Sequence, residues 1–243
     1  MTSSRPPTRR FLRDLLLLGI SVGLVCSVCL NIQLEGLRRD FRNLQSDVGV
    51  LEIDDPAQVA IGWVLSPPEL IPPGVEKAFV WRYRIYLPDN YDPYDRSITR
   101  LVSADSPAGA HQGSGWSNRS KAHEYVASVS LIHSDNGWMV RQQSRGMSST
   151  TNLSGDFLIE SLDDLIIEPI VTAENPTRSF TADEAICLLR IREKTPATDN
   201  DGKPLEDRYR GIAFYLHSAK RSDAFDAWAA GGADSMAEAI ANP

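Results

Sequence analysis

A stretch of 20 residues without a charge, from Leu15 to Leu34, constrains this chain more than any other feature. At about 1.5 Å per residue, a helix of that length spans roughly the 30 Å hydrocarbon core of a bilayer. The sequence therefore predicts a transmembrane helix at 15–34 in the lipid bilayer. The tail at 1–14 carries four arginines. Their excess favours a cytoplasmic amino terminus, with the bulk of the chain outside the cytoplasm.

The residues around this stretch favour a retained anchor over a cleaved signal peptide. A signal peptide has an apolar stretch of about 7–15 residues, followed by a cleavage site with small residues. Here the stretch is longer, and no Ala-x-Ala pattern follows it. Two of the three cysteines, Cys26 and Cys29, lie inside it and are interpreted as packing residues. Because Cys187 is the single cysteine beyond this stretch, we expect no disulfide within the outer domain. The sequence thus predicts a single-pass protein of the cell membrane.

One face of the predicted helix continues without a proline into a helical stalk at 35–54. Small or apolar residues recur along this face in steps that average about 3.6 residues, a spacing that keeps them on one side of a helix. We call this set the helix-association stripe: Gly19, Gly23, Ser27, Leu30, Leu34, Leu37, Phe41, Leu44, Val48 and Leu51. Small residues let membrane helices approach closely, and large apolar residues suit a coiled coil. The stripe predicts a parallel homodimer. The alternatives are packing on the chain's own outer domain or on another protein's helix.

The outer part of the chain is acidic. From Asp55 onward it contains 26 Asp and Glu against 18 Lys and Arg, with no basic stripe. We therefore expect no nucleic-acid partner, and the negative field should repel anionic lipids and polymers.

The clearest strand of the outer part is Phe79–Leu87. Its residues alternate between an apolar side, which begins with Phe79 and Trp81, and a side with Arg82, Arg84 and Tyr86. Such alternation is typical of a strand with one buried face. Further strands are predicted at Ala57–Leu65, Glu124–Ile132, Trp138–Gln143, Phe157–Glu160, Leu165–Val171, Ala185–Arg192 and Gly211–His217. Short strands separated by turn residues predict a mainly β domain at 55–221, an antiparallel β-sandwich or jelly roll.

Local signals fill in the connections of this domain. Asp135-Asn136-Gly137 predicts a tight hairpin turn, and Gly109–Lys121 reads as a polar loop. The segment Ile186–Leu189 is apolar on both faces, which predicts a central strand. The Ala-rich residues 222–243 predict either one or two weak helices, docked through Phe225 and Trp228, or a loose tail.

The strand that runs from Trp81 to Pro88 reads W-R-Y-R-I-Y-L-P. It resembles a motif, W-R-[WY]-R-[IV]-Y-L-P, of uncharacterised bacterial single-pass membrane proteins with a short helical stalk and a β-rich outer domain. A looser similarity lies in residues 183–192. The resemblance implies an architecture and no assigned activity.

No complete motif for catalysis or for a metal emerges. His123-Glu124 begins like H-E-x-x-H, but the second histidine is absent. Residues 199–202, Asp-Asn-Asp-Gly, are similar to a calcium loop but lack carboxylates at the first and last ligand positions, so we predict a hairpin loop there. The four histidines, at positions 111, 123, 133 and 217, are dispersed. We predict no catalytic, cofactor-binding or metal-binding residue and no cofactor.

The best candidate binding face consists of Arg82, Arg84 and Tyr86, because arginine and tyrosine recognise carboxylates and sugars. The alternative is a set of long side chains that protects a sheet edge. Together these features predict a non-catalytic structural or interaction module, whose partner is an unknown envelope protein or polymer. The alternatives are a membrane-tethered enzyme acting on cell-envelope polymers, or an auxiliary subunit of an envelope complex.

Overall fold

The computed structural model describes residues 51, 53–66, 77–109, 112–115, 121–134, 137–144, 147–153 and 162–241, with helical positions 17, 20, 23, 24, 27, 30, 33–35 and 38. The chain divides into two compact units, Met1–Asp47 and Val48–Pro243. Within the described positions, no helix has the length and apolar character that crossing a membrane requires. The transmembrane helix therefore stays a prediction.

The helix-association stripe is described at five of its positions. Gly23, Ser27, Leu30 and Leu34 are helical and exposed. Leu51 lies outside any helix, as does the described Ile53. The stalk at 35–54 stays a prediction. Just beyond it, Asp55 closes a turn into the first strand by accepting a hydrogen bond from the Ala57 amide at 2.9 Å. The stripe residues 19, 37, 41, 44 and 48 are outside the described residues.

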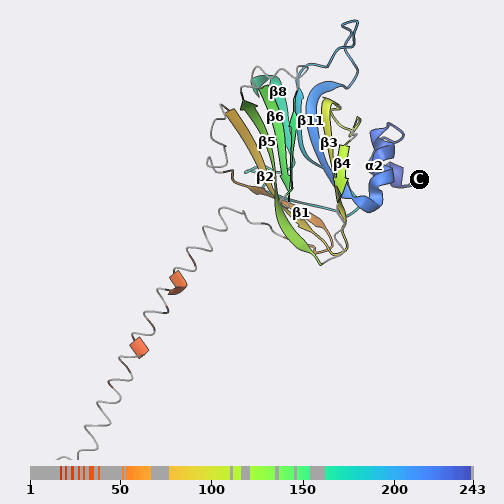
Figure 1. Ribbon diagram of the computed structural model, residues 1–243. Coiled ribbons are helices and arrows are strands. Elements are labelled where there is room, and N and C mark those ends of the chain that lie inside the picture. Colours follow the sequence, from red (N-terminus) through yellow and green to blue (C-terminus); the bar gives the residue numbers. More distant parts are fainter. Residues whose placement is uncertain are drawn as a thin grey trace, which may run out of the picture. The chain divides into compact units, whose positions relative to one another are not determined.

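The second unit is built on two antiparallel sheets (Figure 1). Sheet A has the strand order β7-β6-β5-β2-β1-β9, with β1 at Val59–Val64, β2 at Lys77–Leu87, β5 at His123–Ser134, β6 at Gly137–Ser144, β7 at Met147–Asn152 and β9 at Thr177–Phe180. Sheet B has the order β4-β3-β11-β10-β8, with β3 at Pro93–Val102, β4 at Gln112–Gly115, β8 at Leu165–Pro169, β10 at Ile186–Glu193 and β11 at Tyr209–Ser218. The prediction of a mainly β, antiparallel domain is confirmed.

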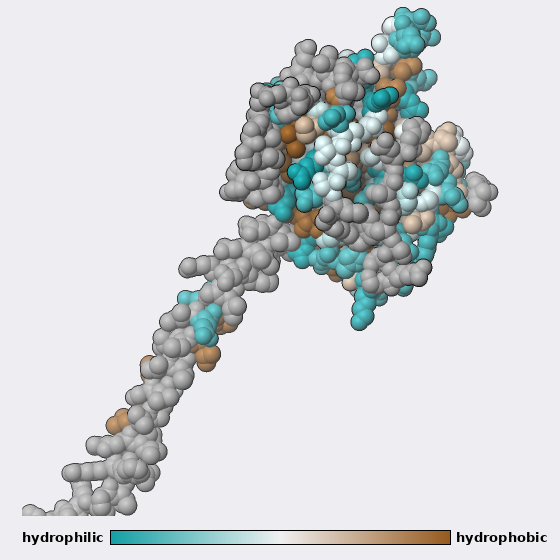
Figure 2. Space-filling view, in the orientation of Figure 1, coloured by the Kyte–Doolittle hydropathy of each residue, from teal (hydrophilic) through white to brown (hydrophobic). Residues whose placement is uncertain are grey.

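The two sheets share one apolar core. On β2, the side chains of Tyr83, Ile85 and Leu87 are buried in it, as the alternation in the sequence predicts. Sheet B contributes apolar residues of β10 and β11 to the same cluster, among them Leu189 and Phe214. On the face seen in Figure 2, hydrophobic residues of the described part form only small separate areas. Burial between the sheets is therefore the main source of stability.

Short helices cover the other face of sheet B. The 3-10 helix η3, Ala219–Arg221, leads from β11 into α2, Ser222–Ala229, and α3 follows at Met236–Ala241. A second apolar cluster joins these helices to the sheet through Phe225, Met236, Ile98, Val102, Ala213 and Tyr215. Figure 1 shows α2 beside β3 and β4 of this sheet. Of the two alternatives for residues 222–243, the described part shows docked helices.

Several local predictions are confirmed. β5 and β6 pair as a hairpin, with Ser134 opposite Gly137 and the turn residues between them outside the described part. β10, which contains the apolar segment 186–189, lies inside sheet B. In the predicted hairpin loop, the Asp199 carboxylate accepts hydrogen bonds from the amides of Asp201 and Lys203 at 2.9 and 2.8 Å. That carboxylate therefore holds a turn.

One predicted loop contains a strand, and three other strands are missing from the prediction. Gln112–Gly115, within the loop predicted at Gly109–Lys121, pairs with β3 as the edge strand β4. On β3, the residues Asp95, Ser97 and Thr99 pair with Leu216, Phe214 and Ile212 of β11 and lie on the same face of sheet B as these partners. Because this face of β3 is polar, the sequence shows no apolar alternation there. β7 and β9 are short, polar edge strands. The strand predicted at Phe157–Glu160 lies outside the described residues.

Candidate functional site

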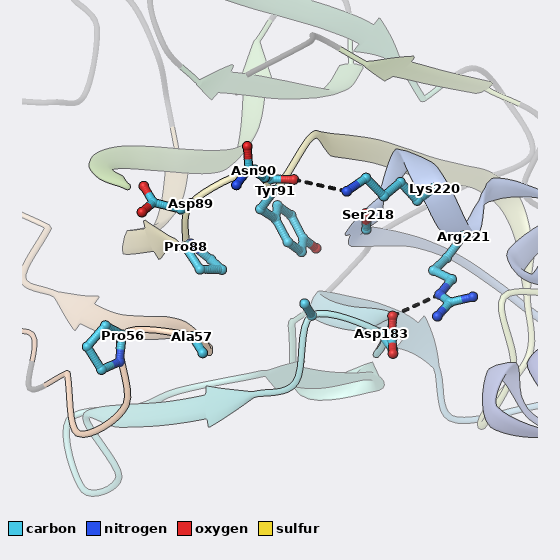
Figure 3. A pocket seen from close by; sticks show the side chains of 11 residues that line it. Pro56, Ala57, Pro88, Asp89, Asn90, Tyr91, Asp183, Ser218, Lys220 and Arg221 are labelled. Carbon is cyan, nitrogen blue, oxygen red and sulfur yellow. Dashed lines mark hydrogen bonds and ion pairs between the residues drawn. The ribbon is translucent and has the colours of Figure 1, made fainter. Parts of the chain in front are cut away.

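A pocket of about 660 Å³ lies where connections from both sheets meet (Figure 3). Four segments line it: residues 56–57 before β1, residues 88–91 between β2 and β3, residues 182–183 before β10, and the end of β11 with η3. Two of these connections join elements of different sheets. The packing of the sheets on one another therefore brings the four segments together.

Hydrogen bonds within and between these segments hold the rim in place. The Tyr91 amide donates to the Pro88 carbonyl at 3.3 Å, across a turn in which Asn90 has a φ of 60°. The Ala219 amide donates to the Asp92 carbonyl at 2.7 Å, which fixes the start of η3 beside this turn. Before β10, the Glu184 carboxylate caps a turn by accepting from the Thr181 amide at 2.8 Å. These hydrogen bonds fix the backbone of the segments that line the pocket.

Charged groups of both signs stand on this rim. The Arg221 guanidinium donates to the Asp183 carboxylate at 2.8 Å, and this hydrogen bond lowers the pKa of that carboxyl. The Lys220 ammonium lies 3.5 Å from the Asn90 carbonyl, a long contact for a side chain that is exposed. Figure 3 shows Lys220 and Arg221 on the same wall, with Asp89 across the opening. Asp89 accepts a hydrogen bond from the Ala122 amide at 2.5 Å.

Tyr91 is the buried aromatic residue of this pocket. It is only 3% exposed, and its hydroxyl has no hydrogen-bond partner among the described residues. Burial raises the pKa of the Tyr91 phenol, and the carboxylates of Asp95 and Asp183 raise it further. The hydroxyl therefore stays protonated at physiological pH and acts neither as a base nor as an anionic nucleophile.

Ser218 lines the pocket, and it directly follows a histidine, His217, in the sequence. His217 and Ser218 are consecutive on β11, so their side chains point to opposite faces of sheet B. The His217 ring stacks on Phe225 on the helix-covered face. The His217 imidazole is thus not placed to activate the Ser218 hydroxyl. The arrangement suits recognition of a polar, charged ligand by Lys220 and Arg221 better than acyl transfer.

The predicted binding face Arg82, Arg84 and Tyr86 lies on the outer side of sheet A, and each residue has a partner within the chain. Arg82 donates to the Leu65 carbonyl at 2.9 Å, and Arg84 pairs with Glu124 at 2.6 Å. Tyr86 is 8% exposed and donates to the Pro56 carbonyl at 3.0 Å. Tyr86 therefore positions a residue of the pocket rim. A binding role for this face stays a prediction.

The histidines and carboxylates do not form a metal site in the part of the chain that the structure describes, since no three of the potential ligands converge there. His123 and His133 lie at opposite ends of β5, and His217 lies on β11 of the other sheet. His111 is outside the described residues.

The sequence contains little that marks the pocket residues. Pro56 reads only as the end of the predicted stalk, Pro88 and Asn90 as turn residues that end a strand, and Lys220 and Arg221 as a short basic pair. No family model matches the chain, and no curated protein or solved structure shows a significant similarity to it.

Proposed function

We propose that this protein is a membrane-anchored β-sandwich that acts outside the cytoplasm as a non-catalytic interaction module. The uncharged stretch at 15–34 supports the anchor, and the two antiparallel sheets with one shared core support the sandwich. The pocket beside Lys220 and Arg221 is the contact site of this module. The observation that best supports this proposal is a pocket rim held by its own turns and hydrogen bonds, with the exposed ammonium of Lys220 at its edge.

The partner is an envelope protein or polymer that presents a single anionic group to this wall, because the net negative charge of the outer part disfavours a polyanion. Lys220 is exposed, and among the described residues its ammonium makes only a long contact, so it has donors left for a ligand. Arg221 binds Asp183 through Nε, which leaves the two terminal nitrogens of the guanidinium for a second acceptor. The pyrrolidine rings of Pro56 and Pro88 add apolar surface for contact. The charge–acceptor contacts select the ligand, and the apolar surface adds affinity.

The test is site-specific photo-cross-linking in living cells. A photoreactive residue at Ala182, on the pocket lining, should give a defined adduct with the partner. Replacing Lys220 with Glu removes a charged hydrogen bond worth about 1.5–3 kcal/mol, so adduct yield at limiting partner should fall roughly ten- to hundredfold. Protease added outside intact spheroplasts should digest the β-domain and remove the adduct.

The matched control is the same photoreactive residue at Thr150, an exposed position on β7. Equal adducts at Ala182 and Thr150, or an adduct unchanged by Lys220→Glu, would count against the pocket as the contact site. A β-domain that resists external protease would contradict the proposed orientation. An adduct that turns over to a cleaved partner would favour the alternative of a tethered enzyme.

We also propose that the helix-association stripe pairs two copies of the chain in parallel. Leu30 and Leu34 are 65% and 45% exposed on the helix, and apart from Gly23, its chain neighbours and the adjacent helix backbone, no described atom lies within 4 Å of the point where a Cβ at Gly23 would be. Close helix packing needs this space, so Gly23→Leu should reduce the yield of cross-linked dimer in membranes severalfold, and Leu44→Asp should do the same in the stalk. Val25→Leu is the control, because a period of 3.6 residues places this position opposite Gly23 on the predicted helix. Unchanged dimer yield in both variants would refute the pairing.

A further inference from the structure

His217 is a fully buried imidazole between the two layers that carry the pocket wall. Its ring stacks on Tyr94 of β3, with ring centroids 5.5 Å apart, and on Phe225 of α2, with centroids 4.5 Å apart. Its side chain is thus enclosed by one residue of sheet B and one residue of the helix that covers the sheet. Docking of α2 is what keeps this imidazole away from water.

The hydrogen bonds of His217 define its protonation state. Its Nδ1 lies 2.9 Å from the Ser218 carbonyl oxygen, which only accepts, so Nδ1 carries the hydrogen. The Nε2 atom then has a free lone pair, and it is buried without a hydrogen-bond partner among the described residues. A proton arriving at Nε2 would create a donor that has no acceptor in this enclosure.

The charges around His217 oppose each other. Arg96 of β3 places its guanidinium over the rings of Tyr94 and Phe225, at 4.7 and 5.6 Å from their centroids. Asp226 of α2 binds that guanidinium at 2.7 Å. Burial lowers the pKa of His217 and Arg96 lowers it further, whereas the hydrogen bond to Ser218 and the charge of Asp226 raise it. The net direction is downward, so the docked state favours the neutral ring.

We propose that His217 is an acid-sensitive latch, which releases α2 from sheet B when its Nε2 takes up a proton and thereby loosens the pocket wall. As regulation of the pocket, this latch rests on the proposed function. His217 is followed directly by Ser218, and η3 supplies Lys220 and Arg221 before α2 begins. Movement of α2 therefore pulls on the segment that carries both cations of the binding site.

The direction of the pH effect follows from linkage. A histidine with a lowered pKa in the docked state contributes fully to docking above its unfolded pKa, which is about 6.5. That contribution decreases as the pH falls from about 6.5 toward the lower pKa of the docked state. Within this window, the opening equilibrium increases by at most about tenfold per pH unit, the slope for uptake of one proton.

The thiol of Cys187 reports on this release. Cys187 is partly buried and packs against the outer cluster of sheet B, as Trp228, Ala229 and Ile240 of the helices do. The full chain, with Cys26→Ser and Cys29→Ser and reconstituted in bilayers, is labelled with a pyridyl disulfide that also reacts at acid pH. The rate is divided by that of the urea-unfolded chain at each pH, which removes the ionisation of the thiol itself.

The latch predicts that this normalised rate is low and constant above about pH 7 and rises toward pH 5, with a slope of up to about tenfold per pH unit. The protection of amides in peptides of 222–229, measured as the exchange rate relative to the intrinsic rate at each pH, should fall over the same range, while the β10 peptides stay protected. In His217→Phe, which fills the space between the two rings without a titrating group, labelling should stay slow at pH 5.

Two outcomes would overturn the latch: a flat normalised rate in the wild type from pH 7.5 to 5, or an equal rise in His217→Phe. If the phenylalanine variant fails to fold, hydrogen exchange of the wild type still decides, because protection of 222–229 that does not fall on acidification, relative to the intrinsic rate at each pH, contradicts the latch. Neither readout uses a ligand. Failure of the latch therefore leaves the cross-linking test of the pocket unaffected, and the reverse holds as well.

Discussion

Replacing Gly211 with alanine should lower the free energy of unfolding of the β-domain by about 3 kcal/mol. Gly211 lies in β11 between β10 and β3, opposite Arg192 on one side and Arg100 on the other. A Cβ at this position would lie 2.3 Å from the Ile191 carbonyl oxygen and 2.8 Å from Cγ2 of Val102. The Ile191 oxygen belongs to the backbone of a central strand, so relief requires the sheet itself to shift.

Urea unfolding followed by circular dichroism measures this loss as a lower midpoint at an unchanged slope. Gly232→Ala is the matched control, since its Cβ would lie 3.3 Å from the Ala227 carbonyl at the end of a short surface helix. We expect a change below about 1 kcal/mol there. Equal midpoints for the two variants would mean that β11 does not pack against β10 as closely as the structure shows.

Replacing Phe225 with alanine should cost about 3–5 kcal/mol of docking free energy for α2. Phe225 is fully buried, and its ring centroid lies 5.7 Å from that of Tyr215 and 4.5 Å from that of His217. It belongs to the outer cluster on sheet B, whereas the main core between the sheets contains no residue of α2. The loss should therefore release the helices and leave the two sheets folded.

Hydrogen exchange distinguishes this local release from global unfolding. In Phe225→Ala at neutral pH, peptides of 222–241 should exchange much faster, while peptides of β10 and β2 keep their protection. Phe225→Leu, which retains most of the buried volume, should lose less than half as much. Loss of protection throughout both sheets would show that the helices are required for the fold of the domain.

The strands that follow a simple alternation are the ones that the sequence predicts well. β2 alternates between apolar residues and a face with Arg82 and Arg84, because one face meets the core and the other does not. The sequence does not predict β3, because Asp95, Ser97 and Thr99 lie on its inner face, where such a pattern would place apolar residues. After Met147, β7 contains only polar residues, and it lies at the edge of sheet A, where it pairs with β6 alone.

The candidate site could not be predicted in the same way. Its rim combines residues near positions 56, 90, 183 and 220, which lie far apart in the sequence of the β-domain. Each of these segments reads as an ordinary connection between strands, with turn residues and exposed charges. The close position of Arg221 and Asp183 results from strand pairing across sheet B, which depends on contacts between distant residues.

Local period, turn chemistry and length predict the β-rich class, the hairpin between β5 and β6, the inner face of β2 and the likeness of 15–34 to a membrane span. The surroundings of each polar group depend instead on how distant segments pack together. His217 reads in the sequence as one dispersed histidine, yet the docking of α2 encloses it between Tyr94 and Phe225. Burial and neighbouring charge set the chemistry of such a group, and both arise when the sheets and helices pack together.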